Sequence, residues 1–277
     1  MRAFLYARKR MVNTLVKLIV SDMDGTLVDD DKNIDTEIFG LLPKLKAAGI
    51  RFVVASGRQY PSLRDDFREH IGDVVVIAEN GAFVMDNGKE LYSRCMTREE
   101  VHSCLDSIAK VEGALPLLCA KTCSYTDNSE LYEHLKSPLF NYTMRLVEDL
   151  YAVEDEVIKV SVIEHAGNGA AHCYGLLRPL LDPALNLVVS GATCMDTGIR
   201  GINKGTAVKA LQEMWGILPE ETMVFGDQQN DMEMFEQAHY SFAMENAAAE
   251  VKARAQYIAG SNNSGGVVKA IREYTGI

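Results

Sequence analysis

Short apolar runs alternate with helical patterns in the first part of the chain and again from residue 205 onward. The apolar runs predict buried strands at residues 17–20, 50–55, 74–78, 222–225 and 240–243. Apolar positions at helical spacing predict helices at residues 35–48, 61–70, 205–215 and 231–238. Since near-continuous apolar runs are typical of parallel strands covered on both faces, the pattern predicts a doubly wound α/β domain.

The middle of the chain follows a different pattern. Residues 83–92 predict a hairpin with Asn87 and Gly88 at its turn, and Thr97 with Glu100 forms a capping box for a helix. Farther along, predicted strands at 157–164 and 185–189 enclose a predicted helix at 170–181. We therefore expect an inserted α+β cap domain at residues 86–193 and a discontinuous core domain at residues 1–85 and 194–277.

Composition agrees with a globular protein of this size. A length of 277 residues predicts two domains, and contents of 47% hydrophobic and 24% charged residues are ordinary. The net charge of −11 argues against nucleic acid or an anionic membrane surface as partner. No run reaches the ~18 apolar residues of a membrane span, so we expect neither a nucleic-acid nor a membrane partner.

The N-terminus and the cysteines bear on location. Basic residues precede an apolar stretch, but Lys17 interrupts it and no small-x-small cleavage site follows. We interpret residues 1–15 as an extension or upstream start, with Met11 as an alternative initiator. The six cysteines lack a Cys-x-x-Cys pair, which favours free thiols and a cytoplasmic location. A zinc site at Cys119 and Cys123 is the less favoured alternative, because its spacing is poor.

The chemistry starts at the end of the first apolar run. Asp22 and Asp24 follow a predicted strand two residues apart and are succeeded by Gly25. Such carboxylates can point to one side, where one attacks phosphorus and the other handles protons. An ordinary turn is the alternative. A calcium loop would need further acidic ligands that residues 32–34 do not supply.

Three later segments complete a set of groups for phosphoryl transfer. Ser56 and Gly57 follow the second strand, Lys204 lies at a predicted helix start, and Asp227 and Asp231 follow a later strand. Because ligand sites of open parallel sheets lie beyond the carboxyl ends of strands, we expect these groups to converge. Carboxylate, hydroxyl, lysine and acidic pair are what metal-assisted phosphoryl transfer needs.

In these motifs the chain resembles the haloacid dehalogenase superfamily of aspartate-nucleophile phosphatases, and within it the Cof-type sugar-phosphatase-like hydrolases. Residues 79–82 and 262–267 also match that pattern. The resemblance covers nearly the whole chain from Lys17 onward. It implies a Rossmann-like core with an inserted C2-type cap and Mg²⁺ as cofactor. We expect a monomer or small homo-oligomer.

The residues and the family resemblance together predict a role for each residue of the expected site. Asp22 is the expected nucleophile, which forms an aspartyl-phosphate, and Asp24 is the expected general acid and base. Ser56 and the N–H of Gly57 are expected to bind phosphoryl oxygens, and Lys204 to neutralise developing charge. The expected metal ligands are Asp22, Asp24 (by its carbonyl), Asp227 and Asp231. Further expected substrate contacts come from Met23, Arg58 and Asn230, although Arg58 is equally suited to a salt bridge.

The cap offers weaker candidates. Lys159, in a predicted strand, either holds a substrate anion or is a solvated lysine at a strand edge; His165, Tyr125 and Lys121 are weaker still. The chain is thus predicted to be a phosphoric monoester hydrolase that acts on a small phosphorylated metabolite such as a sugar phosphate. The alternatives are a phosphomutase and a non-catalytic protein that binds a phosphorylated metabolite on the same fold.

Overall fold

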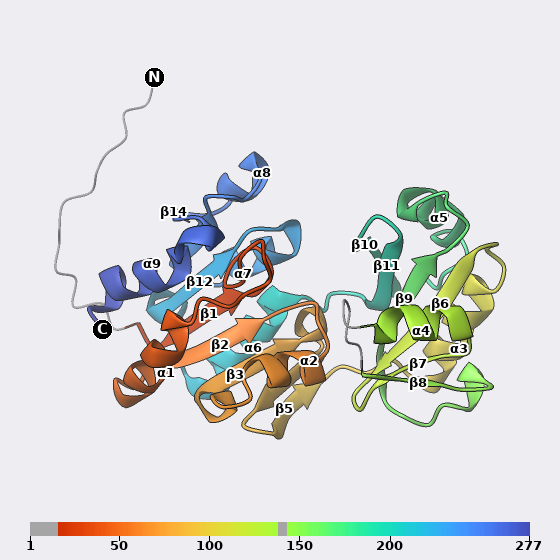
Figure 1. Cartoon of the computed structure of the whole chain (residues 1–277), viewed down its shortest axis with the longest axis horizontal. Helices are drawn as coiled ribbons and strands as arrows, with labels where there is room; N and C mark the ends of the chain where they lie inside the picture. The colour runs from red at the N-terminus through yellow and green to blue at the C-terminus, as the bar shows by residue number, and fades with distance from the viewer. Residues whose placement is uncertain (1–15, 138–142) are drawn as a thin grey trace.

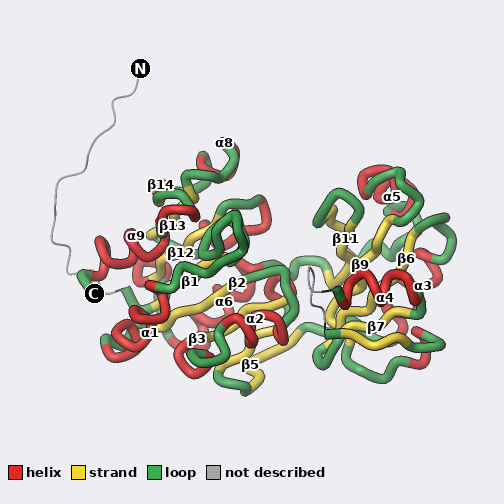
Figure 2. Tube along the Cα trace, in the orientation of Figure 1, coloured by secondary structure: helices red, strands yellow, loops and turns green. Residues whose placement is uncertain are grey.

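The computed structural model describes residues 16–137 and 143–277, so the predictions for residues 1–15 lie outside the described residues. Two sheets, each with its own helices, lie next to each other along the long axis of the molecule (Figure 1). The chain crosses between them after β5 (Lys89–Ser93) and returns before α6 (Lys204–Trp215) (Figure 2). The C-terminus lies at the end of the molecule opposite the second sheet (Figure 1).

The first sheet has the order β14-β13-β12-β1-β2-β3-β4-β5 within the described residues. Its strands are parallel from β14 to β3, and β4 and β5 extend one edge in antiparallel pairing. The other strands span β1 (Leu18–Asp22), β2 (Arg51–Ala55), β3 (Val74–Ala78), β4 (Phe83–Asp86), β12 (Thr222–Gly226), β13 (Tyr240–Met244) and β14 (Tyr257–Ala259). This sheet confirms the predicted α/β fold class.

Helices cover both faces of this sheet because successive strand residues point to opposite sides. In β1, Ile19 packs with the helices α1, α2 and α9, whereas Leu18 and Val20 pack with α6, α7 and α8. These helices span α1 (Glu37–Ala47), α2 (Tyr60–Asp66), α7 (Met232–Phe235), α8 (Ala249–Lys252) and α9 (Gly266–Thr275). Burial on both faces explains the near-continuous apolar runs of the sequence.

Two of these helices and one cap helix end three or four residues earlier than predicted. The predicted helix at 61–70 ends at Asp66, and the one at 231–238 ends at Phe235. The helix predicted at 170–181 is α5 (Ala170–Leu177). Each end is followed by a backbone bond that spans three positions, from the amide of His70 to Phe67, of Gln237 to Met234 and of Leu180 to Leu177. Apolar spacing does not distinguish such turns from a helix.

The second sheet has the order β10-β11-β9-β6-β7-β8 within the described residues and is antiparallel except between β7 and β8. Its strands span β6 (Ala114–Ala120), β7 (Ser124–Thr126), β8 (Met144–Leu146), β9 (Val157–Glu164), β10 (Leu185–Val189) and β11 (Cys194–Ile199). Helices α3 (Arg98–Ile108) and α5 pack on one face, and α4 (Ser129–Lys136) packs on the other. Strands β6, β7, β8 and β11 and helix α4 were not predicted.

The pairing bears on where the two domains meet. The hairpin of β4 and β5 carries Asn87 and Gly88 at its turn as predicted, and it belongs to the first sheet. Strand β11 belongs to the second sheet. We therefore propose that the cap domain begins after Ser93 and ends after Ile199, in place of the predicted limits at 86 and 193. The sequence pattern identifies a hairpin but not the sheet that it joins.

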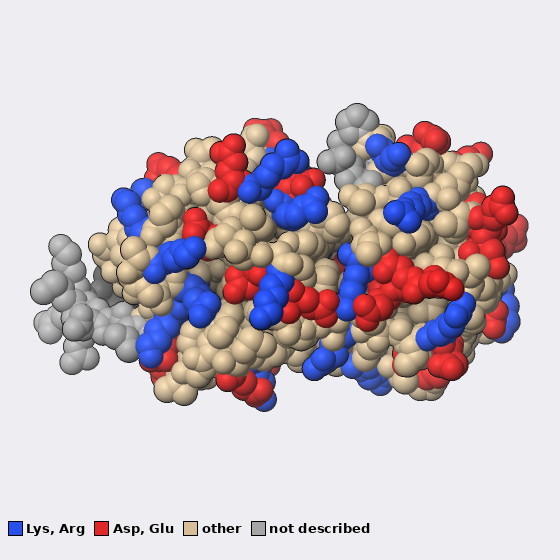
Figure 3. Space-filling model, turned by 90° about the horizontal axis from the view of Figure 1, so that it is seen from below, with Lys and Arg blue, Asp and Glu red and all other residues tan. Residues whose placement is uncertain are grey.

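The surface carries charges of both signs. Acidic and basic side chains are interspersed over both domains on the face that Figure 3 shows. Within residues 16–137 and 143–277, no helix combines the length and hydrophobicity that crossing a bilayer requires.

Candidate active site

A cavity of about 930 Å³ lies between the two domains. On the core side it is bounded by residues that follow the carboxyl ends of parallel strands, among them Asp24 after β1, Ser56 after β2 and Glu79 after β3. Lys204, the first residue of α6, also lines it. The cap contributes residues of β9, β10 and β11. The cavity therefore lies where the order of strands and motifs predicted a site.

Lys204 lies at the centre of the core site. Its Nζ lies 2.6 Å from Asp22 Oδ1 and 2.7 Å from Asp231 Oδ1. Its side chain is 1% exposed, and those of Asp22 and Asp231 are 7% and 0% exposed. Burial opposes the charged form, but the two carboxylates hold the pKa of Lys204 above its ordinary value. Three residues that are far apart in the sequence thus meet in one buried ion-paired cluster.

Backbone and side-chain donors fix the second acidic motif. The amides of Asp227 and Gln228 each donate to Asp231 Oδ2 at 3.0 Å. Asp227 accepts from the hydroxyl of Thr26 at 3.0 Å and from Nε2 of Gln228 at 2.9 Å. The sequence analysis assigned Thr26 and Gln228 no part in this contact. The available signal was sequence position, since Thr26 lies two residues after Asp24 and Gln228 directly follows Asp227.

Gly25 is required by a close approach. Its φ of +81° lies in the left-handed region, and a Cβ atom there would lie 2.5 Å from Asp227 Oδ2. The turn after β1 therefore brings the backbone against the acidic cluster, which only glycine permits.

Asp24 lies apart from this cluster and pairs with Arg58. Nε of Arg58 lies 2.7 Å from Asp24 Oδ2, its second terminal nitrogen lies 2.5 Å from Oδ1, and its first lies 3.0 Å from Asp66. Burial raises the pKa of Asp24, but hydrogen bonds and charge from Arg58, with Lys32 at 3.2 Å, bring that pKa below its ordinary value. Of the two roles considered for Arg58, the structure shows the salt bridge.

Ser56 and the loop after β3 form the next wall of the site. Ser56 is buried, and its Oγ accepts from the amide of Arg58 at 3.1 Å. Its carbonyl accepts from the amide of Asn80 at 2.9 Å, and Asn80 Oδ1 accepts from Asn230 at 3.0 Å. The predicted substrate residues Ser56 and Asn230 are therefore connected through Asn80. Met23 differs, since its side chain packs in the hydrophobic core and it is not among the described residues that line the cavity.

Asp22, Asp227 and Asp231 offer oxygen atoms that all lie within 4.8 Å of one another. Asp22 Oδ2 is buried and has no hydrogen-bond partner among the described residues. Burial and the charge of Asp231 raise the pKa of Asp22 to about 8, against the opposing charge of Lys204. Burial and Asp231 likewise raise the pKa of Asp227.

These carboxylates fit a divalent cation. Three of them face one ammonium group, so the ionised cluster carries two excess negative charges. Hard oxygen ligands and a small number of protein ligands suit Mg²⁺, which keeps several waters. Asp231 already accepts three hydrogen bonds, whereas Asp22 has an unpaired oxygen. Asp22 and Asp227 are therefore better placed as direct ligands than Asp231.

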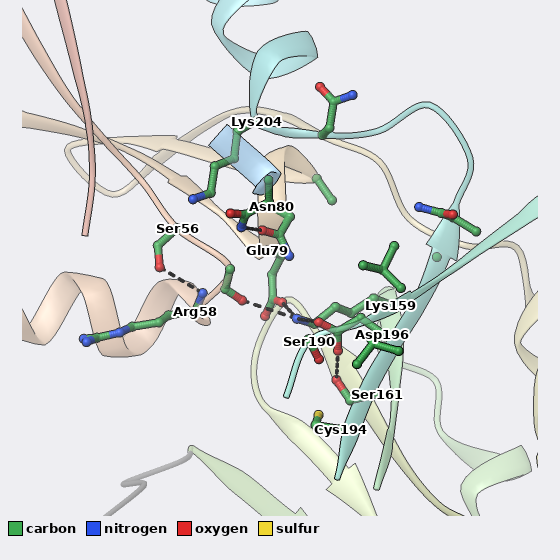
Figure 4. Close-up of a pocket in the computed structure, with 18 of the residues that line it drawn as sticks. Ser56, Arg58, Glu79, Asn80, Lys159, Ser161, Ser190, Cys194, Asp196 and Lys204 are labelled. Atoms are coloured by element: carbon green, nitrogen blue, oxygen red, sulfur yellow. Dashed lines mark hydrogen bonds and ion pairs between the residues drawn. The ribbon is translucent and has the colours of Figure 1, made fainter. Parts of the chain in front are cut away.

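On the cap side, Lys159 points into the cavity from β9 and contacts Glu79 and Asp196 (Figure 4). It lies in an inner strand with a side chain that is 14% exposed, so it is not a solvated lysine at a strand edge. His165, Tyr125 and Lys121 are not among the residues that line the cavity in the described structure. Glu79, Asp196 and Ser161 are polar cavity residues to which no role was assigned from the sequence.

Comparison with known proteins identifies the family. A family model for haloacid dehalogenase-like hydrolases matches residues 19–271. The 5-amino-6-(5-phospho-D-ribitylamino)uracil phosphatase YbjI of Escherichia coli is 33% identical over 281 residues, which cover 92% of this chain and 95% of the relative. The phosphatase YcsE of Bacillus subtilis, named for the same substrate, is 26% identical and covers 94% of this chain and 96% of its own length.

Comparison of the fold with solved structures agrees with the sequence comparison. A crystal structure of a protein from Eubacterium rectale superposes with a TM-score of 0.87 at 27% identity, covering 94% of this chain and 99% of that one. The resemblance seen in the sequence motifs is confirmed: the chain belongs to the haloacid dehalogenase-like hydrolases and is an enzyme of the phosphatase class.

Proposed function

We propose that the protein is a Mg²⁺-dependent phosphatase that hydrolyses a small phosphorylated metabolite through an aspartyl-phosphate on Asp22. The observation that carries this proposal is the position of Asp22. One of its oxygens is 2.6 Å from the buried Lys204 ammonium, and the other has no partner among the described residues. Such a carboxylate is held in place and keeps a free oxygen for phosphorus or metal.

In the first step, an oxygen of Asp22 forms a bond to phosphorus while the bond from phosphorus to the leaving-group oxygen breaks. Asp24, which must be protonated for this step although Arg58 favours its ionised form, gives its proton to that leaving oxygen. In the second step, a water molecule attacks phosphorus, Asp24 takes its proton, and the bond from Asp22 to phosphorus breaks. Inorganic phosphate and free Asp22 result, so the enzyme returns to its starting state.

The remaining residues bind and neutralise. Ser56 and the N–H of Gly57 hold phosphoryl oxygens, and Lys204 offsets charge that develops between Asp22 and phosphorus. Asp22, Asp227 and the carbonyl of Asp24 hold Mg²⁺, with Asp231 in support. When bound, the ion supplies positive charge to the phosphoryl oxygens. Asn230 contacts the phosphate, held by its bond to Asn80.

The substrate class follows from the relatives. The relatives from E. coli and B. subtilis are named for a substrate in which a phosphorylated ribityl chain is attached to a ring. We propose a phosphomonoester of this kind, a sugar phosphate or a polyol phosphate, as the substrate of this chain.

A phosphate-release assay tests the proposal. The full-length protein is incubated with Mg²⁺ and a panel of phosphorylated metabolites that includes the substrate named for the E. coli relative. Asp22→Asn is the test variant, and Asp73→Asn is its control, because Asp73 pairs with Lys46 at the surface. We expect Mg²⁺-dependent release of free phosphate. EDTA should abolish it, and of the two variants only Asp22→Asn should do so. Transfer of phosphate back to substrate would indicate a mutase, and activity in a folded Asp22→Asn protein would remove the nucleophile assignment.

A further inference from the structure

Three basic side chains of the cavity share one feature. Arg58, Lys159 and Lys204 each contact two carboxylates. The pairs are Asp24 and Asp66 for Arg58, Glu79 and Asp196 for Lys159, and Asp22 and Asp231 for Lys204. The negative charge of the two carboxylates thus exceeds the single positive charge of each cation. At Lys204 a divalent cation offsets the excess in the proposed function, whereas the Lys159 group lies outside the candidate metal cluster found in the described structure.

The positive charge of Lys159 is already neutralised by its neighbours. Its Nζ lies 2.9 Å from Glu79, 3.3 Å from Asp196 and 3.3 Å from the carbonyl of Gly57. The contacts with Asp196 and the Gly57 carbonyl are hydrogen bonds, and the contact with Glu79 is an ion pair, so two carboxylates share the single positive charge of Lys159. Figure 4 shows the lysine between the two carboxylates, with the chain of Glu79 reaching toward it from the core. Lys159 therefore does not offer a free positive charge to a second anionic group of a substrate.

The carboxylates around Lys159 keep unused hydrogen-bond acceptor capacity. Asp196 Oδ1 accepts one bond, from the Ser161 hydroxyl at 2.6 Å, and the side chain of Asp196 is 17% exposed. The side chain of Glu79 is 2% exposed, and although its Oε2 lies 2.9 Å from Lys159, the contact lacks hydrogen-bond geometry. Carboxylate oxygens have about four lone-pair sites between them. Unused acceptor capacity in a cavity matches ligand groups that donate, which are hydroxyl and amine groups.

We propose that Lys159, Glu79, Asp196 and Ser161 form a leaving-group subsite that selects a neutral, hydroxyl-bearing chain and rejects a second anionic group. This inference rests on the proposed phosphatase function. A hydroxyl group can donate to Asp196 or Glu79. A distal carboxylate or phosphate would meet two carboxylates whose neighbouring ammonium is already bonded, and like charges brought together in an interface cost free energy. Selection between substrates then comes from the repulsion between these carboxylates and a distal anionic group.

Arg94 is the competing cation. It lines the cavity from the linker after β5, is exposed, and donates to the Ser93 carbonyl at 3.1 Å. A distal anion bound by this enzyme would meet Arg94 and not Lys159, and Arg94→Gln separates the two possibilities.

The test compares two ligands that differ at the far end only. Sorbitol 6-phosphate carries a neutral hydroxyl chain, and 6-phosphogluconate carries a carboxylate at the end of a chain of the same length. Both are titrated as competitors of p-nitrophenyl phosphate hydrolysis by the full-length protein with Mg²⁺, so each yields a value whether or not it is turned over. We expect sorbitol 6-phosphate to compete at least about tenfold better.

Asp196→Asn should reduce the advantage of sorbitol 6-phosphate over 6-phosphogluconate as a competitor. The substitution removes one negative charge while keeping the shape of the side chain. Asp106→Asn is the matched control, since Asp106 lies on the exposed side of cap helix α3 and accepts from Tyr151. Glu79→Gln is the second test variant if Asp196→Asn fails to fold by circular dichroism. Hydrolysis of p-nitrophenyl phosphate should stay within about twofold of wild type in the control Asp106→Asn.

The outcomes are separable. Equal competition by the two ligands, including none by either, overturns the subsite, as does an equal ratio in Asp196→Asn and Asp106→Asn. Tight competition by 6-phosphogluconate that Arg94→Gln abolishes also overturns it and places the anion at the linker. Absence of any p-nitrophenyl phosphate hydrolysis in wild type overturns the proposed function itself, and the subsite with it.

Discussion

Arg58 holds Asp24 in a two-point ion pair, with Nε 2.7 Å from one carboxylate oxygen and a terminal nitrogen 2.5 Å from the other. The same guanidinium contacts Asp66 of α2 at 3.0 Å. The proposed acid and base is therefore positioned by a residue that follows the neighbouring strand. A planar fork fixes a carboxylate in both distance and direction, which a single-point contact does not.

Arg58→Gln should lower kcat about tenfold to a hundredfold, because Asp24 loses its fixed orientation and a misplacement of about 1 Å can cost that much. The measurement is steady-state phosphate release at saturating substrate. Arg64→Gln is the matched control, since Arg64 lies on helix α2 shortly after Arg58, is half exposed and pairs with the surface residue Asp65. An unchanged kcat in Arg58→Gln would show that Asp24 needs no positioning.

Lys204→Met should destabilise the protein and increase the stabilisation that it gains from Mg²⁺. Its removal leaves Asp22 and Asp231 buried beside each other without a counter-charge, at a cost of about 3–5 kcal/mol in the free energy of unfolding. For the same reason Mg²⁺ should raise the melting temperature of this variant more than that of wild type, while activity is lost.

Thermal unfolding with and without Mg²⁺ measures both effects. The control is Lys209→Met, an exposed lysine on the same helix α6. Equal melting temperatures for the two variants in EDTA would contradict a structural role for the Lys204 ion pairs.

Gly25→Ala should raise the Mg²⁺ concentration needed for half-maximal activity. A Cβ atom at this position would lie 2.5 Å from Asp227 Oδ2 and would displace that carboxylate. Gly49→Ala has the same backbone penalty, because Gly49 has a φ of +77°, but its Cβ atom would meet nothing within 4 Å. Both should lose roughly 1 kcal/mol of stability from the left-handed conformation.

A magnesium titration of phosphate release separates the two glycine variants. Only Gly25→Ala should shift in metal dependence, and a matching shift in Gly49→Ala would mean that backbone strain, and not contact with Asp227, is responsible.

The core site could be predicted from the sequence because its residues follow buried parallel strands. Asp22, Ser56 and Asp227 come at or directly after the ends of β1, β2 and β12, whose burial on both faces produces continuous apolar runs. The meeting of those strand ends in one sheet then brings the side chains together. Strand ends and motif order carry this information without knowledge of the register.

The cap sheet could not be predicted in the same way. One of its faces borders the cavity, so polar residues such as Ser161 and Asp196 interrupt the apolar pattern there. Pro116 lies inside β6, where proline normally argues against a strand. It is tolerated because the neighbouring β7 is short and pairs only with Leu118 and Cys119. The contact of Lys159 with Glu79 joins two domains and leaves no local signal.

Lys159→Met should destabilise the protein by about 3 kcal/mol near neutral pH, since it leaves Glu79 buried and unpaired. Burial already raises the pKa of Glu79, and the charge of Lys159 opposes that rise. Without the lysine the folded-state pKa of Glu79 rises further above its unfolded value. A carboxyl group with a raised folded-state pKa binds its proton more tightly in the folded protein, so the stability it contributes is present at low pH. That contribution is lost as pH rises from its ordinary value of 4.5 upward.

The loss of stability in Lys159→Met relative to wild type should therefore be larger at about pH 8 than at about pH 5. Urea unfolding in EDTA at the two pH values measures it. Lys121→Met is the matched control, because Lys121 also joins the cap to β5, but its partners Glu90 and Glu156 are 40% and 65% exposed. Solvated carboxylates lose little when the lysine is removed, so this variant should lose at most about 1 kcal/mol with no trend in pH. The same pH trend in both variants would trace the effect to the general repulsion of an acidic protein, and not to the buried Glu79.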